Sequence, residues 1–368
     1  MANIPAKQTS LEQGRETAAK QGSVYSLGYD DQERLRLTTQ HNSLIALMGT
    51  PPLSPIPSHT HIKTIIDIGC GVNASNSLIF ARNFPHAQVY GVDLSPVSIP
   101  NCPANLTFIE GNILHLMASD PRLAPGSADL VFSRLLISGM QDWTTHITSV
   151  SRLLAPGGWL EMQDIADWNF YVHDDPAPVS KDWNWVEFCM EQLRGPMGLD
   201  MLTFDRADEI LRDEAGLERC ERKVIRLPWG GEGDAGVDEK MRGFMREGRG
   251  AWRAALDRMV DLTVGDEGEE KRGEVKGEVE RTLEPREGMW FPFVVVWGRR
   301  RADIPTPTIT AQAIINAIAA DPFNFNPPFA PTASAIKHSS LPPANPLSAE
   351  LTTKLFTPIP TSKHSPRF

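Results

Sequence analysis

The chain has 368 residues, of which 41% are hydrophobic and 22% are charged, so its length and composition allow one large domain or two smaller ones with a sizeable core. Its formal net charge is −10. Such an acidic chain is poorly suited to phosphate contacts, so we expect neither nucleic acid nor an anionic membrane surface as a partner.

The compartment is predicted from the cysteines and from the absence of long apolar runs. Cys70, Cys102, Cys189 and Cys220 lie far apart in the sequence, as is typical of free thiols in a reducing compartment. No apolar stretch approaches the roughly 18 residues of a membrane-spanning helix, and the N-terminus lacks the apolar core of a signal peptide. We therefore expect a soluble protein of the cytoplasm, with the nucleus as the alternative.

Composition divides the chain into three regions. Residues 1–23 are polar and unpatterned and are predicted to be a disordered leader. Residues 24–300 are predicted to form the folded domain. Residues 301–368 contain twelve prolines and little apolar periodicity, which predicts a disordered tail. The alternative for this tail is a segment that folds on contact with a protein partner.

Strand-like and helical patterns alternate through the central region. Apolar, β-branched runs predict strands, the first of which ends in glycines and is followed by a helical pattern at 74–84. The predicted strands cover residues 64–68, 88–92, 105–109, 128–132, 159–162, 222–227 and 291–297. This alternation predicts an α/β fold with a doubly wound, Rossmann-like sheet and helices on both faces.

Two segments are predicted to be cap elements, at about residues 30–50 and 228–288. The second contains a highly charged stretch, GDEGEEKRGEVKGEVERTLEPREG, which is typical of a solvated helix or loop. The alternative is that its flanking helix, with Met241, Phe244 and Trp252, closes over a pocket.

The glycine loop Asp67–Ala74 (DIGCGVNA) is the most informative motif. It follows a predicted strand and precedes a helix, at the edge of a parallel sheet where ligands bind. Asp93 ends the next strand, where its carboxylate can accept hydrogen bonds from both hydroxyls of a ribose. The loop and this acid together indicate a cofactor that contains a nucleoside.

Two cofactor classes fit this arrangement. Read as G-x-G-x-x-A, the loop matches a dinucleotide fingerprint and would suit an NAD(P)-dependent oxidoreductase. Asp67 before the first glycine, the Pro-Gly-Gly turn at 156–158 and the late strand at 291–297 favour an S-adenosylmethionine-dependent methyltransferase instead. None of the four tyrosines has a lysine four residues later, as short-chain dehydrogenases require.

Seven motifs resemble the class I methyltransferases of fungal secondary-metabolite clusters, a group that includes the velvet-complex regulator. They are LGYDDQERL at 27–35, QH at 40–41, IIDIGCG, QVYGVDLSP, LISGMQDW, LLAPGGWLEMQD and MWFPFVVVWGRR. The resemblance implies a seven-stranded class I sheet, S-adenosyl-L-methionine as cofactor and a small-molecule methyl acceptor from secondary metabolism. Because the group includes a regulator, it also leaves open a regulatory protein that acts through protein partners.

The resemblance also implies a set of cofactor contacts and one catalytic candidate. Asp67, Gly69 and Gly71 would line the methionine part, Asp93 the ribose, Leu94 and Asn112 the adenine, and Ser133 and Arg134 the region beneath the methyl donor. Asn73 stands where relatives have the third glycine, and we expect it to adopt a positive φ with its side chain near the cofactor. His41, in the N-terminal helix, is the candidate catalytic residue.

Three further groups of side chains could belong to a functional site or to the ordinary core and surface. Trp183 and Trp185 are candidates for the wall of an aromatic substrate pocket. Glu161 and Gln163 alternate along a predicted strand and share one face, so one of them can reach a pocket. His173–Asp175 resembles a surface turn, and we expect no metal site.

Overall fold

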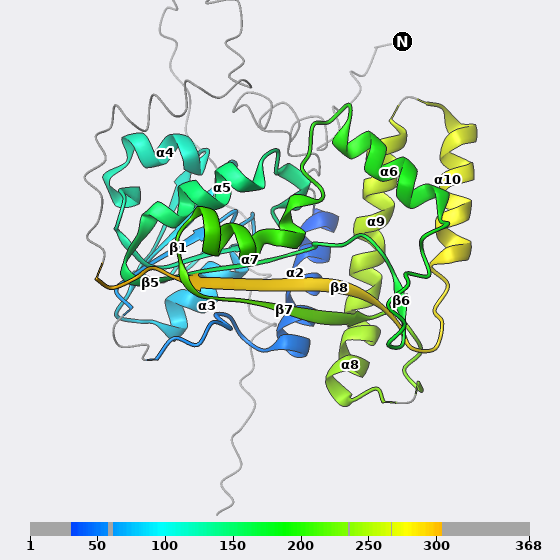
Figure 1. The fold of residues 1–368 in the computed structure, drawn as a ribbon, viewed down its shortest axis with the longest axis horizontal. Coiled ribbons are helices and arrows are strands. Elements are labelled where there is room, and N and C mark those ends of the chain that lie inside the picture. The colour runs from blue at the N-terminus through cyan, green and yellow to red at the C-terminus, as the bar shows by residue number, and fades with distance from the viewer. Residues whose placement is uncertain (1–30, 58–61, 235, 266, 304–368) are drawn as a thin grey trace, which may run out of the picture. The chain divides into compact units, whose positions relative to one another are not determined.

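The computed structural model describes residues 31–57, 62–234, 236–265 and 267–303 (Figure 1). The predicted leader and nearly all of the predicted tail lie outside these residues, and both stay predictions. In the described part of the chain, no helix is long and apolar enough to cross a membrane.

An eight-stranded mixed sheet organises the described residues. Its order is β3-β2-β1-β4-β5-β8-β6, and β7 also pairs with β8. The five strands from β3 to β5 are mutually parallel, whereas β8 runs antiparallel to β5 and to β7. The strands are β1 (Thr64–Ile68), β2 (Gln88–Asp93), β3 (Leu106–Glu110), β4 (Ala128–Arg134), β5 (Leu154–Asp164), β6 (Tyr171–Val172), β7 (Glu218–Pro228) and β8 (Met289–Arg299).

All seven predicted strands are present. β1 has four of its five residues buried, as a central parallel strand covered on both faces should. β5 begins at Leu154 rather than 159, and its pairing with β4 shifts register between Ala128 and Leu130. Pro156 and the two glycines after it therefore lie within the strand. The unpredicted eighth strand is β6, whose two residues pair with Met289 and Trp290.

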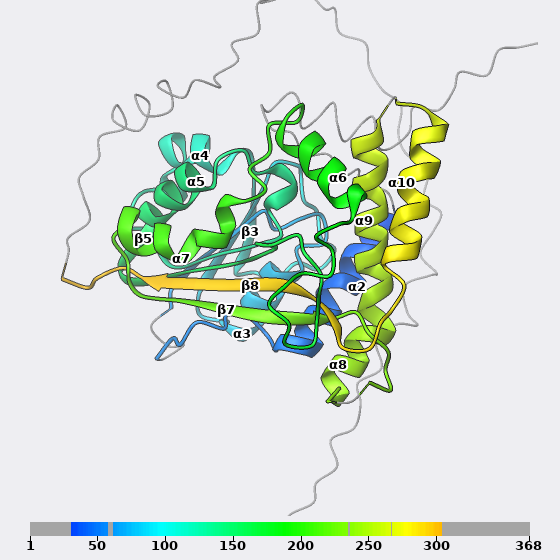
Figure 2. The same ribbon diagram turned by 45° about the vertical axis from the view of Figure 1, so that its right-hand side comes forward.

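Helices cover both faces of the sheet (Figures 1 and 2). On one face, Phe80 of α3 packs against Phe132 of β4, with ring centroids 5.0 Å apart. On the other face, Trp143 of α5 packs against Phe204 at 4.5 Å. The bounds of these two helices are α3 (Ser75–Asn83) and α5 (Trp143–Val150). Two neighbouring helices are α4 (Ile113–Ser119) and α7 (Ala207–Glu209).

A second group of helices stands beyond the carboxyl ends of β1, β4 and β5, where Figure 1 shows α6, α9 and α10 together. The group comprises α2 (Asp31–Met48), α6 (Asn184–Arg194), α8 (Glu239–Gly243), α9 (Arg249–Val264) and α10 (Glu269–Thr282). A π-helical segment, Phe244–Gly248, joins α8 to α9 and contacts α2. The charged stretch forms α10, a mostly solvated helix that buries Val275 and Val279 against its neighbours.

Candidate functional site

The glycine loop leaves β1 with two residues in a conformation that favours glycine. Gly69 has φ +65° and Gly71 has φ +70°. A Cβ on Gly69 would lie 2.2 Å from Cδ2 of Leu136, so a side chain there would require Leu136 to move. A Cβ on Gly71 would meet nothing within 4 Å, so the backbone at Gly71 faces open space. The amides of Gly69 and Cys70 donate to the Val92 carbonyl, which ties the loop to the end of β2.

Asn73 behaves differently from the sequence-based expectation. The positive φ expected at this residue occurs instead at Ala74, with φ 46°, directly before α3. Nδ2 of Asn73 donates to the Arg34 carbonyl at 2.8 Å and to Oγ1 of Thr38 at 3.0 Å. The prediction for Asn73 is therefore wrong on the backbone, and the side chain bonds to α2 instead of extending over the loop glycines.

Asp93 lies beside this loop, at the carboxyl end of β2. Its carboxylate accepts hydrogen bonds from the Gly71 amide at 2.8 Å and the Ser95 amide at 3.0 Å. Burial raises the pKa of Asp93, and the backbone hydrogen bonds oppose that rise. Each carboxylate oxygen has a further lone pair, so Asp93 can still accept bonds from a diol.

The two predicted adenine contacts follow β2 and β3. Leu94, next to Asp93, is half-buried. Asn112 caps α4, and its side-chain oxygen accepts from the Leu114 amide at 2.9 Å. That oxygen also keeps one lone pair, so the predicted bond to an adenine amino group remains possible.

Asp67 supports the loop from inside the protein. Its side chain is buried, and Oγ of Ser77 donates to it at 2.5 Å. Burial raises its pKa to about 7, while the Ser77 bond and the charge of Arg134 act in the opposite direction. The contact of Asp67 with the cofactor stays a prediction.

Arg134 is the charged centre of a buried network at the ends of β4 and β5. Its Nε donates to Oε1 of Gln163 at 2.8 Å, and burial lowers its pKa to about 10, which keeps it charged at neutral pH. Its Nη2 is buried and has no hydrogen-bond partner among the described residues. Ser133, its neighbour in β4, is also buried. Arg134 therefore keeps one unused donor, which must become accessible before it can bond to an anionic group.

Glu161 and Gln163 complete this network and do not reach a pocket, since both are 0% exposed. Nε2 of Gln163 donates to Glu161 at 2.6 Å. The carboxylate of Glu161 also accepts from the backbone amides of Leu53 and Ser54. Glu161 therefore fixes the segment that connects α2 to β1.

His41 is neutral at physiological pH. Burial, followed by the charge of Arg134, lowers its pKa to about 4. Its Nδ1 lies 3.4 Å from Nη1 of Arg134. Because a guanidinium can only donate, Nδ1 is the acceptor and Nε2 carries the proton. In this state His41 has no free lone pair with which to take a proton from a substrate.

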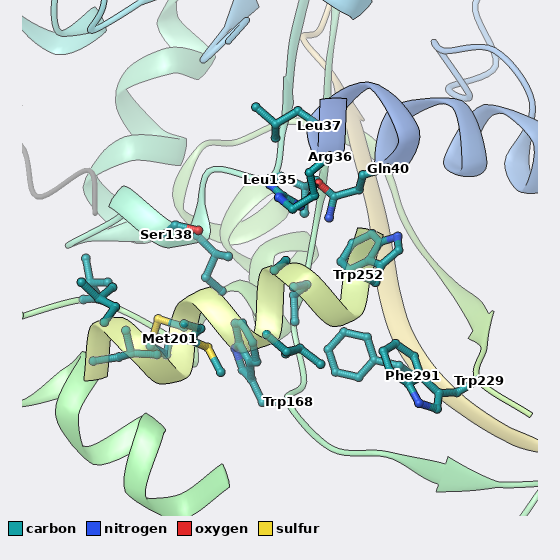
Figure 3. Close-up of a pocket in the computed structure, with 18 residues that line it drawn as sticks. Arg36, Leu37, Gln40, Leu135, Ser138, Trp168, Met201, Trp229, Trp252 and Phe291 are labelled. Atoms are coloured by element: carbon teal, nitrogen blue, oxygen red, sulfur yellow. Dashed lines mark hydrogen bonds between the residues drawn. The ribbon is translucent and has the colours of Figure 1, made fainter. Parts of the chain in front are cut away.

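A cavity of about 100 Å³, partly open to solvent, lies next to these groups (Figure 3). Arg36, Leu37 and Gln40 reach it from α2, and Leu135 comes from directly after Arg134. The other lining residues are Ile137, Ser138, Ile165, Trp168, Leu193, Leu199, Met201, Trp229, Trp252, Ala255, Leu256, Met259, Leu262 and Phe291. A mostly apolar and aromatic lining with a few polar side chains is typical of a small-molecule site.

The sequence identified the wrong tryptophans for this cavity. Trp183 and Trp185 are buried elsewhere, and Trp168, Trp229 and Trp252 line the wall. Trp252 belongs to the segment that was proposed as a cap.

The strand order, the glycine loop and Asp93 together match the architecture expected from the sequence motifs. Residues 66–162 also match a family model described as a methyltransferase domain. These residues are a methyltransferase domain. The expected relation to class I methyltransferases is therefore confirmed, and the domain supports S-adenosylmethionine as the expected cofactor.

Relatives of the methyltransferase domain include fungal proteins of secondary metabolism. The chain is 28% identical to the secondary metabolism regulator laeA of Coprinopsis cinerea, over 51% of this chain and 48% of that protein. It is 32% identical to the methyltransferase str3 of Strobilurus tenacellus, over 43% of this chain and 54% of that protein. The chain thus spans about half the length of these two relatives.

Comparison with solved structures finds a likeness to the phosphoethanolamine N-methyltransferase 2 of Haemonchus contortus in complex with S-adenosyl-L-methionine. It is 14% identical, with a TM-score of 0.42, over 81% of this chain and 61% of that chain.

Proposed function

We propose that this chain is an S-adenosylmethionine-dependent methyltransferase that transfers a methyl group to a small-molecule acceptor. One juxtaposition carries the proposal. The open backbone at Gly71 and the carboxylate of Asp93 lie at the edge of the sheet from which Leu135 extends into a cavity with a mostly apolar lining.

The residues present fit the cofactor. The carboxylate of Asp93 has free lone pairs for the ribose hydroxyls, and the open side of Gly71 permits close approach. The unpartnered Nη2 of Arg134 suits a carboxylate, because arginine forms strong charge-assisted bonds with carboxylates. We therefore assign Arg134 to the methionine carboxylate.

The cofactor supplies an activated methyl group, because its sulfur is positively charged and is a good leaving group. What the chain contributes is orientation and the exclusion of water. Holding two reactants in line can lower a barrier by about 7–11 kcal/mol in favourable cases. None of the residues that line the cavity is an Asp, Glu, His or Lys. We therefore expect this wall to contribute mainly by positioning the methyl acceptor.

His41 is better assigned a positioning role than that of a general base. Its contact with Arg134 orients the guanidinium, and its lowered pKa makes it a weak proton acceptor.

Calorimetric titration with S-adenosylhomocysteine tests the cofactor assignment, with NAD(P) titrated in parallel. Binding of S-adenosylhomocysteine alone supports the proposal. Binding of NAD(P) alone would favour the oxidoreductase that the glycine fingerprint also allows.

A regulatory role is the second candidate, because one relative of the domain bears the name of a secondary metabolism regulator. Such a role requires a protein partner. The segment 301–368 is the candidate contact for that partner. A stable complex that survives deletion of that segment would argue against the segment as the contact. The cellular location, cytoplasm or nucleus, stays a prediction.

A further inference from the structure

The wall of the cavity is almost entirely apolar. Apart from Arg36, Gln40 and Ser138, the side chains that line it are aliphatic, aromatic or thioether groups. An ammonium group that entered the cavity would meet no acidic side chain among the lining residues that the structure describes. The wall is therefore poorly suited to a cationic ligand.

The polar side chains of the wall already have partners within the chain. Nε and Nη2 of Arg36 donate to the carboxylate of Glu33 at 2.8 and 2.7 Å, and Nη1 donates to Oε1 of Gln40 at 3.1 Å. Ser138 has a partner as well. A carboxylate in the cavity would have to compete with Glu33 for Arg36. Because burying a charge without a partner of its own is costly, the wall favours an uncharged ligand.

Aromatic rings gather at one end of the cavity. The rings of Trp168 and Phe291 lie edge to face, with centroids 6.2 Å apart. Behind this wall, the buried ring of Phe170 packs against Phe291 at 4.8 Å and against Trp229 at 5.3 Å, which fixes the orientation of both rings. Aromatic rings prefer stacked or edge-to-face neighbours, so a flat ring would pack well against this end.

The other end of the cavity lies toward the sheet edge. Figure 3 shows Arg36, Gln40 and Leu135 together at the top of the view, whereas Phe291 and Trp229 lie at the lower right. Leu135 directly follows Arg134, the last residue of β4. A ligand whose ring lies at the aromatic end therefore has its other end on the side of the proposed cofactor site.

The size of the cavity limits how much of a ligand it can enclose. Its volume is about 100 Å³, and part of it is open to solvent. A cavity of about 150 Å³ in a protein core holds one benzene molecule. The enclosed space is therefore on the scale of a single ring, and the rest of a larger ligand would extend through the open side.

We propose that the cavity binds an uncharged aromatic ring of the methyl acceptor and excludes rings that carry an ammonium or carboxylate group. The ring packs against Trp168 and Phe291, and the atom that accepts the methyl group lies on the side of Leu135. This inference rests on the proposed function, since it names the chemical class of the acceptor.

Three fluorinated probes of one shape test the preference for an uncharged ligand. At about pH 7, 4-fluorobenzyl alcohol is neutral, 4-fluorobenzylamine is a cation and 4-fluorobenzoate is an anion. Titrations of the full chain, followed by the fluorine NMR signal of each probe, give the three dissociation constants. We expect the alcohol to bind roughly tenfold or more tightly than either ion, because neither ion finds an unpaired opposite charge in the wall.

A competition experiment tests the preference for a flat ring. Benzyl alcohol and cyclohexylmethanol each displace 4-fluorobenzyl alcohol, and the concentrations needed are compared. Benzyl alcohol should be effective at a severalfold lower concentration, because only its ring can stack on the aromatic wall. Cyclohexylmethanol is the more hydrophobic of the two, so a cavity without aromatic preference would favour it instead.

Variants of α9 locate the binding site. Ala255 lines the cavity, whereas Ala254, its neighbour on the same helix, is not among the lining residues, and both are half-buried. Ala255→Phe should fill the space and weaken the binding of 4-fluorobenzyl alcohol severalfold or more. Ala254→Phe is the matched control and should bind the probe like the parent. Leu262→Phe, which also changes a lining residue, is the second filling variant, and melting temperatures show whether each variant is folded.

The outcomes separate this inference from the proposed function. Equal affinity for the alcohol and the two ions, stronger displacement by cyclohexylmethanol, or full affinity in a folded filling variant would overturn the inference, even if S-adenosylhomocysteine binds. The comparisons of probes use the parent chain, so they decide the matter even if no variant folds. If the probes behave as expected but S-adenosylhomocysteine does not bind, the cavity assignment holds and the methyltransferase proposal fails.

Discussion

The side-chain amide of Asn73 donates a 2.8 Å hydrogen bond to the main-chain carbonyl of Arg34, and so joins the glycine loop to α2. A second bond runs to Oγ1 of Thr38, one turn further along the same helix. Arg36, Leu37 and Gln40, which line the cavity, belong to this helix as well. The loop that would hold the cofactor and the wall that would hold the acceptor are therefore mechanically connected through α2.

Replacement of Asn73 should loosen this connection. We expect Asn73→Gly to increase the rate of limited proteolysis within α2 severalfold, because both side-chain bonds to the helix are lost. Thr38→Val removes only one of them and should give an intermediate rate. Mass spectrometry of the fragments locates the cleavage, and equal rates in parent and Asn73→Gly would show that the connection contributes little.

Asp93→Ala should weaken the binding of S-adenosylhomocysteine by about tenfold or more. Hydrogen bonds to charged groups contribute about 1.5–3 kcal/mol each, and 1.4 kcal/mol corresponds to one decade of affinity. Asp129→Ala is the matched control, because Asp129 also accepts from two backbone amides, Lys63 and Thr64, but near the start of β1. Calorimetry should show that only the Asp93 variant loses affinity, whereas both variants can lose thermal stability.

Arg134→Met should lower the affinity for S-adenosylhomocysteine but not that for 5′-methylthioadenosine, which lacks the methionine carboxylate. The ratio of the two dissociation constants, measured by calorimetry for parent and variant, reports the contact directly. Arg134→Lys should retain part of the preference, since a lysine keeps the charge but loses the planar fork. An equal loss of affinity for both compounds would assign Arg134 a purely structural role.

The buried carboxyl of Asp67 should make stability fall with rising pH. Its pKa in the folded chain is about 7, against an ordinary value of 3.8, so the folded state holds the proton more tightly. Stability is lost as the pH rises from about 4 to about 7 and is level above that range. At about 1.4 kcal/mol per pKa unit, the loss is on the order of 4 kcal/mol.

Asp67→Asn removes this titration while keeping an acceptor for Ser77. The free energy of unfolding of the variant relative to the parent should therefore increase between about pH 4 and pH 8. Denaturant unfolding at several pH values measures this difference. A difference that does not change with pH would mean that Asp67 ionises at its ordinary pKa.

The fold could be predicted well from local patterns. Buried parallel strands are mostly apolar and β-branched, as in TIIDI, and the sequence located all seven of the longer strands. Boundaries were less certain, because the early part of β5 is held by distant residues: Leu154 pairs with Ala128 of β4, and Gly157 and Gly158 bond to the backbone of Arg300. β6 has two residues and depends on its partner β8, so it leaves no periodic signal.

The candidate site was only partly predictable. The glycines after β1 indicated the loop, and the acid at the end of β2 indicated Asp93. Both signals are local, because each residue type stands at a strand end where the chain turns. The cavity wall brings residues from α2, α9 and several loops together, and no local pattern reports such a set. The left-handed residue is Ala74 rather than Asn73, and the Asn73 side chain contacts the distant Arg34 and Thr38, which no local pattern reports.

The close approach of Gly69 and Leu136 has an evolutionary consequence. A Cβ at position 69 would collide with Leu136, and both chain neighbours of Leu136, at positions 135 and 137, line the cavity. A mutation at position 136 that helps the chain to accept a new substrate therefore changes the space available to the cofactor loop. Among diverging homologues, residues 69 and 136 should covary, and bulkier side chains at 136 should be tolerated only where the loop has also shifted.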